Sequence, residues 1–155
     1  MIRLTNIGLS RALHAPLYDR LVRFCERYTP EGMAEPIVNL WMNRMYMDDP
    51  SIHILVNLDD KMNIVEHAVV EVKSEGGQYV IYCHQAERDK PNLKTLTEGL
   101  EYIEKLRSSL NGITVLFVND KPQAYAKLGG YQVMRYILVR YPEGEAESES
   151  VEETS

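Results

Sequence analysis

One strand-to-helix junction of the sequence carries residues that could bind an anion. The segment "CHQAERDKPNLKTLTEGL" (residues 83–100) passes from an apolar run into a helical pattern, and Arg88, Lys90 and Lys94 place positive charge around the turn. Free backbone N–H groups and the positive end of a helix N-terminus favour a phosphate group. Loops of that kind usually contain glycine, but this turn has none before Gly99. An ordinary solvated connection is therefore the alternative interpretation.

Four side chains on or beside the neighbouring strands could accept a proton, since carboxylate and imidazole groups are common general bases. They are Glu66, His67, His84 and Glu87. Glu66 and His67 are adjacent on a predicted strand and point to opposite faces, so at most one of them can enter a given cleft. A strand histidine without a paired motif is more often structural or exposed. The four histidines of the chain have no metal-ligand spacing, and we predict no metal site.

The elements that must position these residues begin with an edge strand and two helices. "MIRLTNI" (residues 1–7) alternates imperfectly and could form the strand. Apolar residues at helical spacing predict a helix over 15–28, with Pro16 in its first turn. A second apolar stripe, with Pro36 early, predicts another helix that ends at "DDP" (residues 48–50), because the residue before a proline resists helix.

Three strands, a helix and a fourth strand follow. Runs rich in β-branched residues predict strands over 51–58, 64–72 and 78–84, and the short turns between them imply antiparallel hairpins. Leucine and isoleucine at helical spacing predict a helix over 93–110, which "NG" ends. The apolar run "ITVLFV" (113–118) is typical of a buried strand. The β-α-β crossover should place 78–84 and 113–118 parallel and side by side.

The remaining elements complete one domain. "KPQAYAKLGG", with Pro122 early, predicts a short helix, and residues 131–141 predict a long final strand. The fold class is therefore α/β (α+β), with a mixed, mostly antiparallel sheet of six or seven strands and helices on both faces. We predict a single domain over residues 1–141. Residues 142–155 form an acidic tail that cannot bury enough surface to offset its ordering entropy, so we expect it to be disordered.

Composition excludes several classes of function. The chain of 155 residues is 45% hydrophobic and 26% charged, which favours one soluble globular domain. No apolar run approaches the roughly 20 residues of a membrane span, and the first residues lack the pattern of a signal peptide. Six of the 23 acidic residues lie in the tail, so the other 17 match the 17 basic residues and leave no nucleic-acid footprint. Cys25 and Cys83 form no motif. We predict a cytoplasmic protein with reduced thiols that binds neither nucleic acid nor membrane.

The order of elements over residues 1–141 resembles the GNAT superfamily, the acyl-CoA-dependent N-acetyltransferases. The most specific local piece is "VLFVNDKPQAYAKLGGYQV" (115–133), which looks like the family's fifth strand, its fourth helix and the start of its last strand. Gly130 and Tyr131 stand where the family usually has phenylalanine. The last strand also departs from the family, which usually ends in a two-stranded hairpin. The residues that match the family pattern are Asn119, Ala124, Tyr125, Ala126, Lys127, Leu128 and Gly129.

The resemblance implies an acetyl-CoA site between the two parallel strands. The pantetheine arm would run along strand 78–84, and the pyrophosphate would lie on the following loop, under the N-terminus of the third predicted helix. In that loop Pro91 and Leu93 replace the family's glycines, and proline also removes an N–H donor. The implied cofactor-binding residues are Tyr82, Cys83, His84, Arg88, Lys90, Asn92, Leu93 and Asn119.

The resemblance also implies that Tyr125 is the catalytic acid. A phenol with an unperturbed pKa of about 10 is protonated at neutral pH and could donate to the departing thiolate. Packing of Tyr125 on the sheet is the alternative, as is helix capping for Asn119.

The predicted function is transfer of an acetyl group from acetyl-CoA to an unidentified amine on a small molecule or a protein. The alternative is a non-catalytic binding or structural protein of the same fold, of the small divergent kind that occurs in tailed-phage genomes. An exposed edge strand could also pair with a second copy to give a homodimer or larger assembly.

Overall fold

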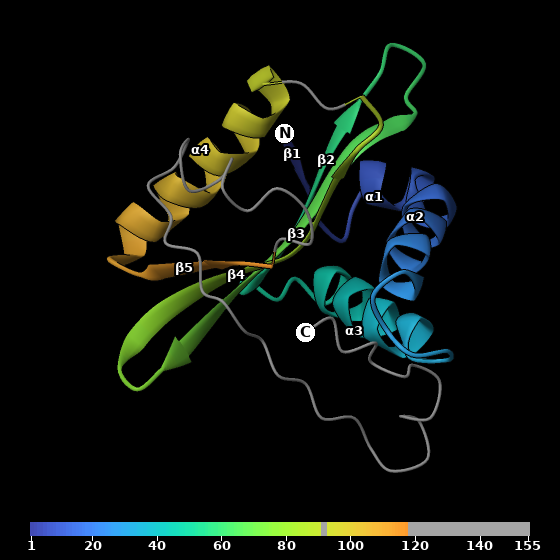
Figure 1. Cartoon of the computed structure of the whole chain (residues 1–155). Helices are drawn as coiled ribbons and strands as arrows, with labels where there is room; N and C mark the ends of the chain where they lie inside the picture. The colour runs from blue at the N-terminus through green and yellow to red at the C-terminus, as the bar shows by residue number, and fades with distance from the viewer. Residues whose placement is uncertain (91–92, 118–155) are drawn as a thin grey trace, which may run out of the picture.

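A computed structural model of the chain describes residues 1–90 and 93–117 (Figure 1). The predicted helix after strand 113–118, the predicted strand 131–141 and the acidic tail lie outside the described residues. The elements in chain order are β1 (Ile2–Leu4), α1 (Leu9–Ala12), α2 (His14–Glu26), α3 (Ala34–Tyr46), β2 (Ile52–Leu58), β3 (Ile64–Glu75), β4 (Gln78–Arg88), α4 (Leu93–Leu110) and β5 (Ile113–Leu116).

The described strands form one five-stranded sheet in the order β1-β2-β3-β4-β5. Neighbouring strands are antiparallel except for β4 and β5, which are parallel, with Val80 opposite Ile113. The predicted hairpins and the predicted parallel pair are therefore confirmed. The described sheet has five strands, fewer than the six or seven predicted, and the sixth predicted strand falls outside the described residues.

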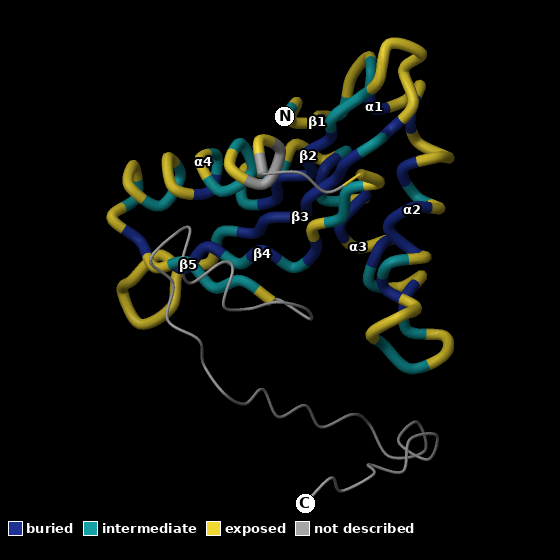
Figure 2. The backbone as a smooth tube through the Cα atoms, turned by 45° about the horizontal axis from the view of Figure 1, so that its top comes forward, coloured by how far each residue is buried: buried dark blue, intermediate teal, exposed yellow. Residues whose placement is uncertain are grey.

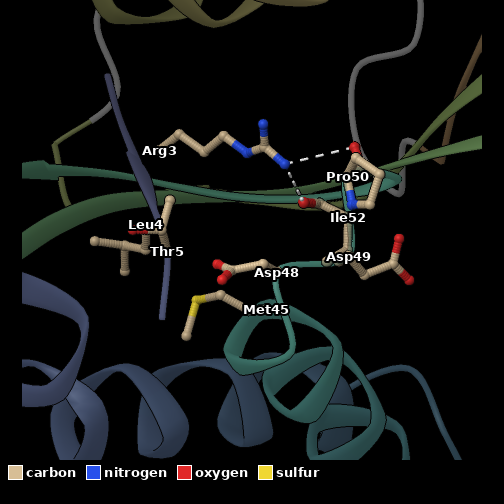
Figure 3. A pocket seen from close by; sticks show the side chains of 8 residues that line it. All are labelled: Arg3, Leu4, Thr5, Met45, Asp48, Asp49, Pro50 and Ile52. Carbon is tan, nitrogen blue, oxygen red and sulfur yellow. Dashed lines mark hydrogen bonds between the residues drawn. The ribbon is translucent and has the colours of Figure 1, made fainter. Parts of the chain in front are cut away.

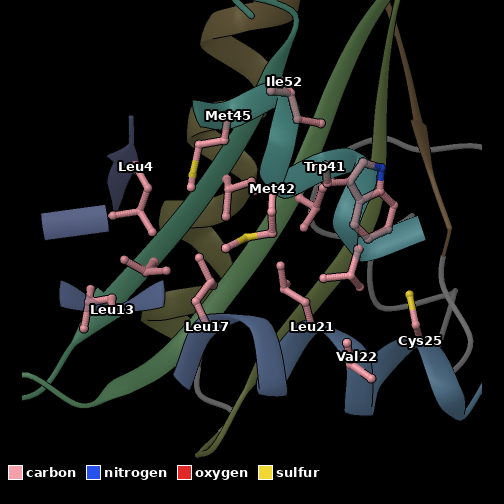
Figure 4. Close-up of a cluster of buried hydrophobic side chains, with 14 of the residues drawn as sticks. Leu4, Leu13, Leu17, Leu21, Val22, Cys25, Trp41, Met42, Met45 and Ile52 are labelled. Atoms are coloured by element: carbon pink, nitrogen blue, oxygen red, sulfur yellow. The ribbon is translucent and has the colours of Figure 1, made fainter. Parts of the chain in front are cut away.

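Helices cover both faces of the sheet, as predicted (Figures 1 and 2). Helices α1, α2 and α3 lie on one face, where Leu17, Leu21 and Val38 are fully buried against sheet residues such as Ile54 (Figure 4). Helix α4 lies on the other face, where Ile103 packs with residues of β2, β3 and β4. The short helix α1 was not predicted, since four residues are too few to show a helical period.

Strands β3 and β4 are longer than predicted. Pairing of the two strands extends from Glu75 opposite Gln78 to Glu66 opposite Arg88, so β4 ends four residues beyond the predicted residue 84. At the other end Gly76 and Gly77 both have positive φ, which the tight hairpin turn requires. The turn into α4 consequently begins after Arg88.

The junction between α4 and β5 requires glycine at position 112. A Cβ atom there would lie 2.7 Å from Cδ1 of Ile81 and 2.9 Å from the carbonyl oxygen of Tyr79. This close approach brings β5 directly alongside β4 after the helix has crossed the sheet. None of the described helices is long and apolar enough to span a membrane.

Candidate functional site

The described pairing between strands β4 and β5 ends at Cys83. Their ladder ends with Cys83 opposite Leu116, followed by one hydrogen bond of 3.3 Å from the backbone N–H of Phe117 to the carbonyl oxygen of Cys83. Strand β4 continues from His84 to Arg88, paired only with β3 among the described residues. The other backbone edge of this part of β4 has no strand partner among the described residues.

A β-bulge at His84 lies at the same point. Val69 is opposite Gln85 and Val70 is opposite Cys83, which leaves His84 as the extra residue of β4. Bulges occur next to active sites because they turn a side chain away from the regular alternation.

The imidazole of His84 lies among aromatic rings. Its centroid is 5.5 Å from that of Trp41 in α3, 5.9 Å from that of Tyr82 and 5.7 Å from that of Phe117, with all ring planes within 27° of parallel. This stacking fixes the plane of the imidazole. The His84 side chain is 22% exposed, so solvent or a ligand can still reach it.

Nε2 of His84 is 2.9 Å from Oε1 of Glu71, which lies on β3 and is almost completely buried. Burial raises the pKa of Glu71, but the hydrogen bonds from Arg44 and His84 outweigh it, and the pKa falls below its ordinary value. Glu71 is therefore a carboxylate at neutral pH, and it accepts the hydrogen of Nε2. In the neutral imidazole, Nδ1 then keeps a free lone pair that can accept a proton.

The two residues of β4 before His84 have different environments. The hydroxyl of Tyr82 donates to the Glu75 carboxylate at 2.9 Å, and this bond raises the pKa of Tyr82. Cys83 is buried on the α4 face, and burial raises the pKa of its thiol to about 12. A thiol with so high a pKa is a poor nucleophile, so Cys83 can contribute to this edge only through its backbone.

His67, one of the candidate bases, is fully buried and has both ring nitrogens occupied. Nε of Arg20 donates to Nδ1 of His67 at 2.8 Å, and Nε2 of His67 donates to Oε1 of Gln85 at 3.0 Å. Burial, followed by the charge of Arg20, lowers the pKa of His67 to about 4. His67 is therefore a neutral structural residue that links α2 to the sheet.

The two glutamates considered as bases are engaged in ion pairs. Glu66 is buried and accepts hydrogen bonds from Nε of Arg88 at 3.2 Å and from Nδ2 of Asn57 at 2.8 Å. Glu87 pairs with Arg27 and, at 3.8 Å, with Arg20. Among the four candidates, His84 thus has the most suitable geometry for accepting a proton.

The residues predicted for the anion loop are distributed over strand, turn and helix. Arg88 is the last residue of β4 and directs its guanidinium to Glu66, Lys90 is exposed in the turn, and Leu93 is the first residue of α4. Asn92, Asn119 and Tyr125 lie outside the described residues. The described residues contain no cluster of three or more His, Cys, Asp or Glu side chains that could hold a metal ion.

Glu71, Arg44 and Phe117 were not predicted as site residues. A signal was present for Glu71, since it is a charged residue between Val70 and Val72 in a run that is apolar from Ala68 to Val70. The bulge that brings His84 to Glu71 left no sequence signal that we could interpret.

Comparison with solved structures gives matches over most of the chain. A predicted acetyltransferase from Clostridium acetobutylicum, solved with acetyl-CoA, has a TM-score of 0.65 at 10% identity and covers 86% of this chain and 92% of its own. Glucosamine-6-phosphate N-acetyltransferase from Arabidopsis thaliana has a TM-score of 0.61 at 10% identity and covers 87% and 94%. The chain has the fold of the GNAT acetyltransferases.

A third protein of this fold, an aminoglycoside 6′-N-acetyltransferase from Acinetobacter baumannii, has a TM-score of 0.57 at 8% identity and covers 92% of this chain and 97% of its own. Comparison with protein-family models and with curated proteins gave no match. The resemblance to the GNAT fold predicted from the order of elements is thus confirmed by three-dimensional structure, at sequence identities that establish the fold alone.

Proposed function

We propose that the protein is an N-acetyltransferase that transfers the acetyl group of acetyl-CoA to an amine. The observation that carries this proposal is the histidine–carboxylate pair of His84 and Glu71, which lies next to the last described residue pair of the parallel strands β4 and β5. The GNAT fold supports an acetyltransferase-like activity, and it supports the choice of acetyl-CoA through the C. acetobutylicum protein solved with that compound.

The proposed roles in proton transfer follow from the orientation of His84. The nitrogen of the acceptor amine attacks the carbonyl carbon of the thioester, and Nδ1 of His84 takes the proton that the amine loses. Glu71, already bonded to Nε2, stabilises the imidazolium that forms. The carbon–sulfur bond then breaks, and we assign Tyr125 as the acid that protonates the departing thiolate.

The residues proposed to hold acetyl-CoA lie around the end of the described β4–β5 pairing and in the turn that follows β4. The backbone of Tyr82, Cys83 and His84 would bond the pantetheine arm. For the pyrophosphate we propose Arg88, Lys90, Asn92 and Leu93, and for a further contact Asn119. Arg88 is bonded to Glu66 at the end of β4, and Lys90 is exposed in the turn that follows.

Binding and turnover can be tested separately on the full-length protein. Isothermal titration with acetyl-CoA should show one site, and saturation at about 100 times the dissociation constant should stabilise the fold by about 2.7 kcal/mol. Release of CoA is then measured with a panel of amines, beginning with glucosamine 6-phosphate and an aminoglycoside, the acceptors named for two proteins of this fold. No binding at millimolar acetyl-CoA would overturn the proposal. Binding without turnover on any amine would favour the non-catalytic alternative.

A further inference from the structure

The guanidinium of Arg44, near the end of α3, joins three separate parts of the chain. Nε donates to Oδ2 of Asp49 at 2.8 Å, one Nη donates to Oγ of Ser51 at 2.6 Å, and the other Nη pairs with Oε2 of Glu71. The Arg44 side chain is 23% exposed. A planar fork that makes three directed contacts has little freedom to rotate, unlike a single-point ammonium.

The side of Arg44 away from Glu71 is held by a fixed turn. Oδ1 of Asp49 accepts from both the backbone N–H and the hydroxyl of Ser51, at 2.9 Å and 2.6 Å. The hydroxyl of Ser51, followed by Arg44, lowers the pKa of Asp49 to about 2, so this anchor stays ionised. The same turn borders a pocket of about 190 Å³ (Figure 3), whose lining residues are Arg3, Leu4, Thr5, Met45, Asp48, Asp49, Pro50 and Ile52.

The two oxygens of Glu71 are divided between its partners. Oε2 is taken by Arg44, while Oε1 accepts from Nε2 of His84 at 2.9 Å and lies 3.6 Å from Nζ of Lys73. If Arg44 released Oε2, the carboxylate could rotate about its last bond toward the exposed Lys73. The bond to His84 would then lose its direction.

We propose that Arg44 is a positioning residue that holds Glu71 in the orientation in which it bonds Nε2 of His84 and directs Nδ1 toward the acceptor amine. This inference rests on the proposed function for its catalytic consequence. The other charged or titratable groups around the pair are Lys73 and Glu75 of β3, Tyr82 of β4 and, through Arg44, Asp49. No further charged group of the described residues bonds Glu71 or His84.

The test compares Arg44→Gln, which removes the charge, with Arg44→Lys, which keeps the charge but cannot reach all three partners. Arg107→Gln is the matched control, because it breaks an ion pair with Glu104 on the exposed side of α4. For each variant we would measure kcat and the KM for acetyl-CoA. We would also titrate the Glu71 carboxyl by carbon-13 NMR, assigning its signal with Glu71→Gln, and follow folding by circular dichroism.

We expect Arg44→Gln to lower kcat by about 10- to 100-fold with little change in the KM for acetyl-CoA, because positioning of the base is lost and cofactor binding is not. The pKa of Glu71 should rise. Arg44→Lys should return the pKa of Glu71 toward its wild-type value while kcat stays low, which separates position from charge. Arg107→Gln should match the wild type in all measurements.

Three results would overturn the inference: an unchanged Glu71 titration in folded Arg44→Gln, an unchanged kcat in that variant, or a wild-type kcat in Arg44→Lys. Failure of the proposed function is a different result. In that case the wild-type protein neither binds acetyl-CoA nor releases CoA, and the NMR titration still decides whether Arg44 controls Glu71.

Discussion

Two histidines on neighbouring strands show how one sheet can hold a structural residue and one that we propose as a proton acceptor. His67 is buried against α2, accepts a hydrogen bond at Nδ1 and donates one at Nε2, and is kept neutral by burial and by Arg20. His84 is the extra residue of a β-bulge, its side chain is 22% exposed, and its Nε2 bonds the carboxylate of Glu71. The two histidines differ in the hydrogen-bond partners of their ring nitrogens. Nδ1 of His67 accepts a hydrogen bond from a buried guanidinium, which opposes its protonation, whereas Nε2 of His84 bonds a carboxylate, which favours protonation of the ring.

The largest expected effect is on turnover. His84→Gln removes the proposed base but keeps a side chain of similar size among the same rings, and it should lower kcat by about 10²- to 10⁴-fold. Steady-state assays with an accepted amine would measure this change. An unaffected kcat would show that His84 is not the base, and His84 would then be a structural residue like His67.

The next largest effect is expected on the stability of the fold, when the donor to His67 is removed. Arg20→Met removes the donor to His67 and the 2.8 Å ion pair with Asp89, and it should reduce the free energy of unfolding by about 3 kcal/mol. Urea denaturation followed by circular dichroism would measure the loss. An unchanged free energy of unfolding would show that the contacts of Arg20 do not stabilise the fold.

A smaller effect is expected on the pH dependence of stability, to which the buried His67 should contribute. The pKa of His67 is about 4 in the folded protein against about 6.5 in an unfolded chain, so its neutral form stabilises the fold fully above pH 6.5. That contribution is lost as the pH falls from 6.5 toward 4, because the unfolded state then binds a proton that the folded state does not. His53, also with a pKa lowered to about 4 by burial and by Arg3, should add to the loss.

Denaturation midpoints measured between pH 7 and pH 4 would check this sign. The wild type should lose stability over that range, and His67→Gln and His53→Gln should each lose less than the wild type. Equal acid dependence in all three proteins would show that neither histidine is held neutral by the fold.

The smallest effect is expected on the exposed side of α4. Glu104→Gln removes a carboxylate that pairs with Arg107 at the surface, where water and salt screen the interaction. The unfolding midpoint and kcat should both match the wild type. A measurable loss of turnover here would mean that α4 contributes to the site in a way that the described residues do not indicate.

Much of this architecture could be predicted from the sequence because it depends on local periodicity. The helical stripe over 93–110 and the β-branched runs fixed the type and order of the elements. The crossover rule then placed 78–84 beside 113–118, as the structure confirms. The GNAT resemblance followed from that order and is supported by the structural neighbours.

The contacts of the candidate site could not be predicted in the same way. The bond between Glu71 and His84 depends on one extra residue in β4, and a bulge changes the register by an amount that alternation alone does not reveal. The length of β4 was underestimated because polar residues near its end, such as Glu87 and Arg88, resemble a loop in sequence. They are instead held in the strand by Glu66, Arg20 and Arg27.

Strand β3 lies at the centre of the described sheet, and its successive side chains point alternately to the two faces. His67, Val69 and Glu71 face α1–α3, whereas Ala68 and Val70 belong to the core under α4. Substitutions along β3 should therefore alternate in effect between the face that contacts α1–α3 and the face that packs under α4. Deletion of a single residue would move the side chains beyond it to the opposite face. Substitutions on the face that carries Glu71 can therefore be made without repacking the α4 core, provided that the length of the strand is preserved.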